Sequence, residues 1–235
     1  MKRLILSAAI LLPALSPLAS ANEPAVPRQN YALHLEANPS EPFPFLKKLG
    51  KVEISVFPEG VRADSLWLDG FVLQGADTVR IENPALRLYT DASFDSLRKL
   101  FQKLRPENEE QPALKALKVV DTGRVGKIGK LPVRCHRIVL GEKAWIDLWW
   151  TSALAKNPAY ERLQHELLSV VSPDLALAAR RVPGTIVHVV LNTERFPDTT
   201  LLAVREVYLS SAGHEEALKT GRFFLRAPSL DRLVK

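Results

Sequence analysis

The chain has 235 residues, of which 46% are hydrophobic, and its formal net charge is +6. This apolar content is sufficient for a core, and the mild basicity, with charges of both signs interspersed, does not indicate a nucleic-acid partner. Because the sequence contains a single cysteine, Cys135, an intramolecular disulfide is excluded and stability must come from packing.

Residues 1–21 predict a cleavable export signal. Lys2 and Arg3 precede an apolar run over residues 4–18, and small residues follow at 19–21. The run is broken by two prolines and is shorter than the ~20 apolar residues of a spanning helix, so we expect no membrane span. The residue directly after the predicted cleavage site is Asn22, so no cysteine stands there to accept a lipid anchor. The mature protein is therefore expected to be soluble and periplasmic.

Residues 22–46 form a proline-rich leader in this interpretation. Five prolines in this stretch exclude a regular helix and favour extended chain. Within it, Tyr31–Glu36 is a candidate edge strand, and the sequence leaves open whether this segment joins a sheet. Residues 47–235 are predicted to form a single antiparallel domain.

The domain begins with a pattern of period two. Val52, Ile54 and Val56 share one face of a predicted strand, with polar residues between them, and Asp69-Gly70 marks a hairpin turn. Further strands are predicted over 61–68, 71–73, 78–82, 85–90, 117–125, 131–140, 144–151, 185–194, 200–210 and 221–226. Short strands separated by regular turn signals predict an antiparallel barrel or sandwich.

Helices interrupt this β pattern. The first is predicted over 94–105, after Asp91 or Ser93 as N-cap, and the second begins at Asn157-Pro158. A third runs from Ser172 to Ala179, and a short terminal helix begins at Ser229. The second helix is expected to bury Tyr160, Leu163, Leu167 and Val170.

No motif indicates catalysis. The five histidines lack the short spacing of a metal site, and there is no nucleophile elbow, phosphate-binding loop or dinucleotide fingerprint. We therefore predict no catalytic residue, no metal and no cofactor. Cys135 and His136 are adjacent, but neighbours in a strand point to opposite faces, so they are expected to form no dyad. Cys135 is predicted to be a buried, inert thiol.

Two carboxylate pairs would suit a hydrolase. They are Asp64 with Asp69, and Asp147 with Glu206. Nothing in their spacing selects them over the other acids, because exposed strand faces commonly carry such groups.

The predicted strand over 144–151 is apolar on both faces. Trp145 and Trp149 lie on one face, and Ile146, Leu148 and Trp150 lie on the other. Such a strand must be covered twice, by a helix on one side and by a second sheet, a partner or an apolar ligand on the other.

The helix over 94–105 has an apolar side and a basic side. Arg98, Lys99 and Lys103 on the basic side suit contact with an anionic membrane surface. The alternatives are a lid over a hydrophobic cavity, or an ordinary helix that packs on the sheet and exposes its charges to solvent.

Several of these segments together resemble a known type of protein. A glycine-led turn over 122–129, the Cys135 strand, the tryptophan strand ending at Trp150 and the segment 182–187 are similar to a bacterial exported family of unknown function. That family is related in architecture to the Lol-type periplasmic lipoprotein carriers, and the resemblance covers about 51–212. It implies an α+β, mainly antiparallel fold: a half-open barrel or curved sheet with two or three helices on or in its concave side.

The resemblance also implies a hydrophobic concavity that in the carriers takes acyl chains, but it transfers no binding residue. We expect an exported, non-enzymatic protein that binds a lipid or a lipid-modified polypeptide. The candidate contacts are Trp67, Phe101, Leu104, Trp149 and Trp150. The alternatives are an envelope protein-interaction module without a cavity, or a hydrolase whose acids and histidines converge only in the folded chain.

Overall fold

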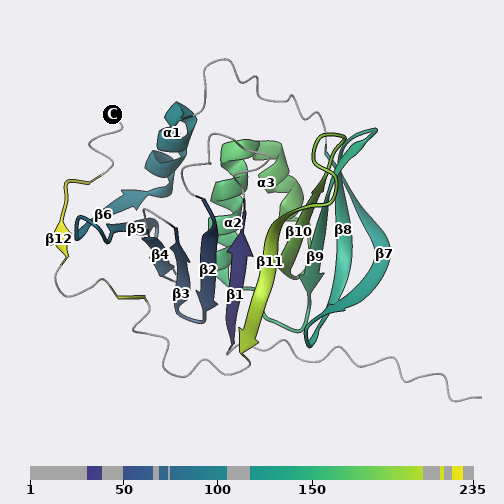
Figure 1. Ribbon diagram of the computed structural model, residues 1–235, viewed down its shortest axis with the longest axis horizontal. Coiled ribbons are helices and arrows are strands. Elements are labelled where there is room, and N and C mark those ends of the chain that lie inside the picture. The colour runs from purple at the N-terminus through teal and green to yellow at the C-terminus, as the bar shows by residue number, and fades with distance from the viewer. Residues whose placement is uncertain are drawn as a thin grey trace, which may run out of the picture.

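The computed structural model describes residues 31–38, 50–65, 69–73, 75–104, 117–208, 218–219 and 224–229. These residues form one open sheet of twelve strands and three helices (Figure 1). The fold is α+β with a curved, mainly antiparallel sheet that does not close, as expected. No described helix combines the length and apolar character needed to cross a membrane.

The strands follow the spatial order β12-β6-β5-β4-β3-β2-β1-β11-β10-β9-β8-β7. Neighbours pair antiparallel, except that β12 runs parallel to β6. The strands are β1 (Ala32–Ala37), β2 (Val52–Phe57), β3 (Gly60–Asp64), β4 (Asp69–Leu73), β5 (Thr78–Asn83), β6 (Leu88–Ser93), β7 (Lys118–Ile128), β8 (Leu131–Gly141), β9 (Ala144–Thr151), β10 (Thr185–Asn192), β11 (Thr199–Tyr208) and β12 (Leu225–Arg226).

Strand β1 corrects one expectation. The segment was expected at a sheet edge, but β1 lies inside the sheet, where Leu33 pairs with Val56 of β2 and Val207 of β11. Leu33 and Leu35 are 0% and 2% exposed. Because β1 pairs with strands on both sides, part of the proline-rich stretch 22–46 belongs to the sheet.

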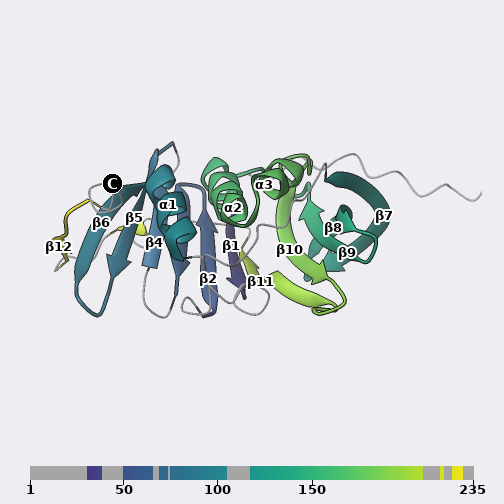
Figure 2. The ribbon, with the colours of Figure 1, turned by 90° about the horizontal axis from the view of Figure 1, so that it is seen from above.

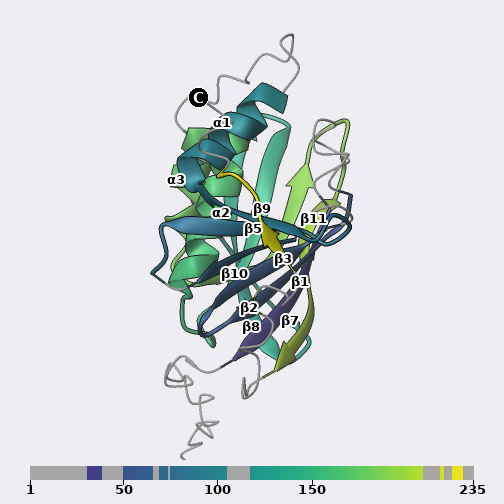
Figure 3. The same ribbon diagram turned by 90° about the vertical axis from the view of Figure 1, so that its left-hand side faces the viewer.

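Three helices lie along one face of the sheet, and the β7–β11 end of the sheet is strongly curved (Figures 2 and 3). They are α1 (Phe94–Leu104), α2 (Pro158–Val171) and α3 (Pro173–Ala179). Ser93 Oγ accepts a hydrogen bond from Ser96 N at 3.1 Å, as a helix N-cap does. The terminal helix expected from Ser229 lies outside the described residues.

The buried side of α2 differs from expectation in its second half. Tyr160 is 1% exposed and Leu163 packs against the core, but Leu167 is 43% exposed. Leu168 and Val171 are the half-buried side chains of this part of the helix, because α3 packs on that side. The side chain of Val170, also expected to be buried, lies outside what the structure describes.

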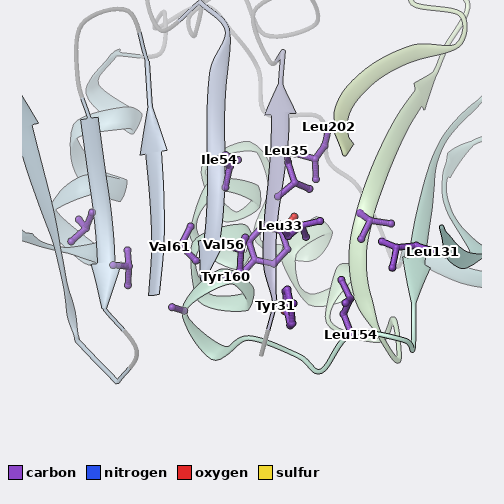
Figure 4. Close-up of a cluster of buried hydrophobic side chains, with 14 of the residues drawn as sticks. Tyr31, Leu33, Leu35, Ile54, Val56, Val61, Leu131, Leu154, Tyr160 and Leu202 are labelled. Carbon is purple, nitrogen blue, oxygen red and sulfur yellow. The ribbon is translucent and has the colours of Figure 1, made fainter. Parts of the chain in front are cut away.

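Two apolar clusters anchor the helices to the sheet. In the first, Tyr160 of α2 packs over Leu33 and Val56 at the sheet centre (Figure 4). In the second, Leu175 of α3 packs against β8–β10, including Trp150. Both faces of β9 are therefore in contact with a core cluster, because Trp149 packs with the first and Trp150 with the second.

Candidate ligand cavity

A cavity of about 600 Å³ lies beside α2, where α3 and the chain leading into β10 form its other walls. Its apolar lining comes from α2, α3 and the start of β10: Tyr160, Leu168, Ala176, Ala179, Val182 and Ile186. Four of these side chains are buried: Tyr160, Ala176, Val182 and Ile186. The cavity therefore has a buried apolar floor.

Local sequence signals place the walls. Asn157 caps α2, because its Oδ1 accepts from Tyr160 N at 3.0 Å, and its Nδ2 donates to the Phe57 carbonyl of β2 at 2.7 Å. The Tyr160 hydroxyl donates to the Ile186 carbonyl at 3.1 Å. These bonds tie the first turn of α2 to strands on both sides of the sheet centre, which fixes the floor of the cavity.

The rim of the cavity is charged. The lining includes three cations and two acids: Lys156, Arg162, Arg180, Glu161 and Glu166. All but one of these side chains are held in ion pairs. Lys156 pairs with Glu161 at 2.8 Å, Arg162 with Asp77 at 2.7 Å, and Glu166 with Arg98 at 2.5 Å. The exposed Arg180 side chain makes no hydrogen bond or ion pair with any residue that the structure describes.

His165 also lines the cavity. Its side chain is 19% exposed, and its buried Nδ1 has no hydrogen-bond partner among the described residues, since Glu166 Oε1 is 3.8 Å away. Burial, and then the positive charge of Arg180, lower the pKa of the imidazole. His165 is therefore neutral at pH 7 and adds no charge to the rim.

Known proteins resemble this chain only distantly. No family model and no curated protein matches the chain. Among solved structures, an uncharacterized conserved protein from Thermus thermophilus is similar, with a TM-score of 0.42, 6% identity, and coverage of 87% of this chain and 93% of that one. PNGF-II gives TM-scores of 0.39 and 0.34 in two crystal forms, at 10% and 13% identity, and this chain covers 32% of its length. Likenesses at these TM-scores carry no conclusion about function.

Of the predicted ligand contacts, the two whose side chains the structure describes, Trp149 and Trp150, do not line this cavity. Trp67 lies outside the described residues, as do the side chains of Phe101 and Leu104 in α1. Trp150 is 7% exposed, and its Nε1 donates to His136 Nδ1 at 2.8 Å, under α3. Trp149 points to the opposite face of β9, so one ligand cannot contact both rings from the same side.

The predicted membrane-contact residues are partly engaged within the protein. Arg98 binds Glu166 and thereby links α1 to α2. Lys99 pairs with Asp95 at 2.9 Å, but both side chains are 59% exposed. Lys103 is exposed near the end of α1. The basic side of α1 is thus accessible at its two lysines.

The face of β9 that carries Trp149 also carries a buried acid. Asp147 is 4% exposed and binds Arg124 at 2.5 Å and Arg137 at 2.7 Å. Although burial opposes ionisation, these guanidinium groups hold the pKa of Asp147 below its ordinary value. The guanidinium groups of Arg124 and Arg137 also lie over Trp149 and Trp145, 5.1 and 4.5 Å from the ring centroids.

Cys135 is a buried thiol, as predicted. It is 0% exposed, its Sγ accepts a hydrogen bond from Arg124 at 2.9 Å, and burial raises its pKa. His136 lies on the other face of β8, beside Trp150. The two adjacent residues therefore form no dyad.

One predicted carboxylate pair is brought together. Asp64 of β3 lies opposite Asp69 of β4, which lies opposite Glu82 of β5. Arg62 is a cation shared by the row, with N–O distances of 2.6, 3.1 and 3.8 Å to the three acids in that order. Burial raises the pKa of Asp64 and Asp69. Glu82 is 2% exposed, and its Oε1 has no hydrogen-bond partner in the described ranges.

The other carboxylate pair is not formed, because β10 separates Asp147 on β9 from Glu206 on β11. Neither His136 nor His188 lines the cavity. Across the described ranges, no group of histidine, cysteine and acidic side chains has an arrangement that would hold a metal ion.

Sequence reasoning named Tyr160 and the Asn157-Pro158 start of α2 but missed most of the other cavity residues. Glu161, His165 and Leu168 follow one another at the i, i+4, i+7 spacing of a single helix face, which is a signal that the sequence does contain. Arg180 caps the C-terminal end of α3, where a cation suits the helix dipole, and it also lines the cavity.

Proposed function

We propose that this chain is an exported, periplasmic binding protein that holds a lipid or a lipid-modified polypeptide, with the acyl part in the cavity between α2 and α3. The observation that supports it is a cavity of about 600 Å³ with a buried apolar floor and a charged rim. Ligand sites typically have volumes of about 300–1,000 Å³, and each buried CH₂ contributes roughly 0.8 kcal/mol. The predicted signal over 1–21 supports the periplasmic location.

A pair of tryptophan substitutions on α2 tests this proposal. Gln164 lines the cavity and is half-buried, whereas Leu167, three residues later, is 43% exposed and does not line it. Gln164→Trp fills the cavity with an indole ring and is expected to weaken the binding of dodecanoate, measured by isothermal titration calorimetry, at least ~10-fold. Leu167→Trp is the matched control and should bind as the wild type does. Equal affinity of the two variants would contradict the proposed site.

Transfer to or from a membrane is part of the same proposal. The accessible Lys99 and Lys103 place two positive charges on α1. Contact with anionic lipid is worth about 1 kcal/mol per basic residue near the surface. The double variant Lys99→Glu with Lys103→Glu is expected to lose sedimentation with anionic vesicles. Unchanged sedimentation would remove membrane contact from the proposal.

One observation favours a second function, an envelope protein-interaction module. Arginine and tryptophan are enriched in protein-binding hot spots. Arg124 and Arg137, 43% and 31% exposed, cover Trp149 and Trp145 on a face of β9, and Trp145 Nε1 is buried without a hydrogen-bond partner in the described part of the chain. Co-purification of one stoichiometric partner with ligand-free protein would favour this function.

A further inference from the structure

We infer that the ligand carries an anionic head group and that Arg180 binds it at the mouth of the cavity, an inference that rests on the proposed function. The charges of the residues that line the cavity support an anionic head group. Three cations face two acids, and His165 is neutral, so the rim has one positive charge in excess.

That excess charge is located on one residue. Lys156 is bound to Glu161 and Arg162 to Asp77, while the Arg180 guanidinium makes no hydrogen bond or ion pair with the residues described. An anionic head group would therefore find an available guanidinium, which binds carboxylate or phosphate oxygens through charge-assisted hydrogen bonds.

The acids of the rim exclude the opposite chemistry. Glu161 is paired with Lys156 at 2.8 Å, and Glu166 is paired with Arg98 at 2.5 Å. A cationic head group would have to displace one of these intramolecular cations. It would gain little, because it only exchanges one ion pair for another.

The distribution of burial sets the orientation of the ligand. Arg180 and Lys156 are exposed, whereas Ala176, Val182 and Ile186 are at most 7% exposed. An amphiphile satisfies both regions when its head group lies at Arg180 and its chain lies against the floor. The ligand class is therefore a single-chain or acyl-bearing anion rather than a neutral lipid.

Four probes separate the head group from the chain. Dodecanoate, dodecanol and dodecyltrimethylammonium share one chain length, and acetate carries the head group alone. Each is titrated calorimetrically into the full mature protein and into two variants, Arg180→Gln and Arg181→Gln. Arg181 is the matched control, because it is the exposed neighbour and does not line the cavity.

The expected order in the wild type is dodecanoate, then dodecanol, then dodecyltrimethylammonium, with no measurable acetate binding. Dodecanoate should bind about 10-fold more tightly than dodecanol, the size of one charge-assisted hydrogen-bonded contact. Arg180→Gln should remove that difference and leave dodecanol affinity unchanged, and Arg181→Gln should keep it. Because Arg180 is exposed, its substitution leaves the core intact.

Other results overturn the inference in distinguishable ways. Equal binding of dodecanoate and dodecanol, or an unchanged preference in Arg180→Gln, would refute the anionic head group and leave the proposed function standing. Acetate binding as tight as that of dodecanoate would identify a site for a free anion. Failure of every twelve-carbon probe to bind would refute the proposed function itself.

Discussion

Gly184 connects α3 to β10 and lines the cavity, and its replacement by alanine tests whether these walls pack as described. A Cβ at this position would lie 2.4 Å from Cε3 of Trp150 and 2.5 Å from the carbonyl oxygen of Thr151. Optimal contacts between carbon atoms lie at about 3.5–4.0 Å, so the contact with Cε3 is about 1 Å too short, and the contact with the oxygen is also too close for a real Cβ. Neither neighbour moves easily, because Trp150 is 7% exposed and bonded to His136, and the Thr151 atom belongs to the backbone of β9.

Overpacking of a rigid site costs typically about 1–3 kcal/mol, and these two contacts favour the upper end. At roughly 2–4 °C per kcal/mol for a protein of this size, Gly184→Ala should lower the melting temperature by about 6–12 °C. Thermal unfolding followed by circular dichroism measures this shift. Gly141→Ala is the control, because nothing lies within 4 Å of its Cβ position and it should melt at or slightly above the wild-type temperature. Melting of Gly184→Ala within about 2 °C of the control would refute the packing of β9 against the α3–β10 connection.

Three further predictions concern the charged and thiol groups. Arg62→Met should lower the free energy of unfolding in urea by about 2 kcal/mol or more at pH 7.5, and by less at pH 5, because it leaves three facing carboxylates without their cation. The control Arg134→Met, at an exposed position, should have no effect. Equal losses in the two variants would contradict the role of Arg62 as the cation of the row. Cys135 should react with a thiol reagent at least ~100-fold more slowly in the native protein than in protein unfolded in guanidinium, since its thiol is buried and its pKa is raised. Rapid labelling of the native protein would show that the thiol is not buried. Burial lowers the pKa of His165 and His188 below 6.5, so the unfolded chain binds protons that the folded chain does not. Stability should therefore fall as the pH drops from 7.5 towards 5. Substitution of both histidines by glutamine should make the melting temperature depend less on pH, and an unaltered slope would contradict the buried, neutral rings.

Most elements of the fold were predictable, because their signals are local. Strands β7 to β9 and helices α2 and α3 begin or end near glycine, asparagine-proline or serine-proline signals, and their predicted bounds agree with the structure to within about three residues. The pairing of β1 was not predictable. Its register with β11 joins residues about 170 positions apart, such as His34 and Glu206, and no local pattern specifies such a partner.

The cavity was less predictable than the fold for a related reason. Its walls combine the charged side of α2 with the far end of α3, and in the sequence a charged helix side is typical of a solvated surface. The sequence predicts ligand contacts at the tryptophans of β9 because large aromatics dominate apolar sites. The structure uses Trp150 to pack α3 and Trp149 to support Arg124, so these rings serve packing in the described residues.

Native mass spectrometry of the protein produced with its predicted signal, followed by solvent extraction and lipid analysis, tests the central claim most directly. We predict a polypeptide mass that begins at Asn22 together with a discrete mass excess that resolves into acyl-bearing anions. A bare polypeptide mass, unchanged after incubation with envelope lipids, would contradict the account of a lipid-binding cavity.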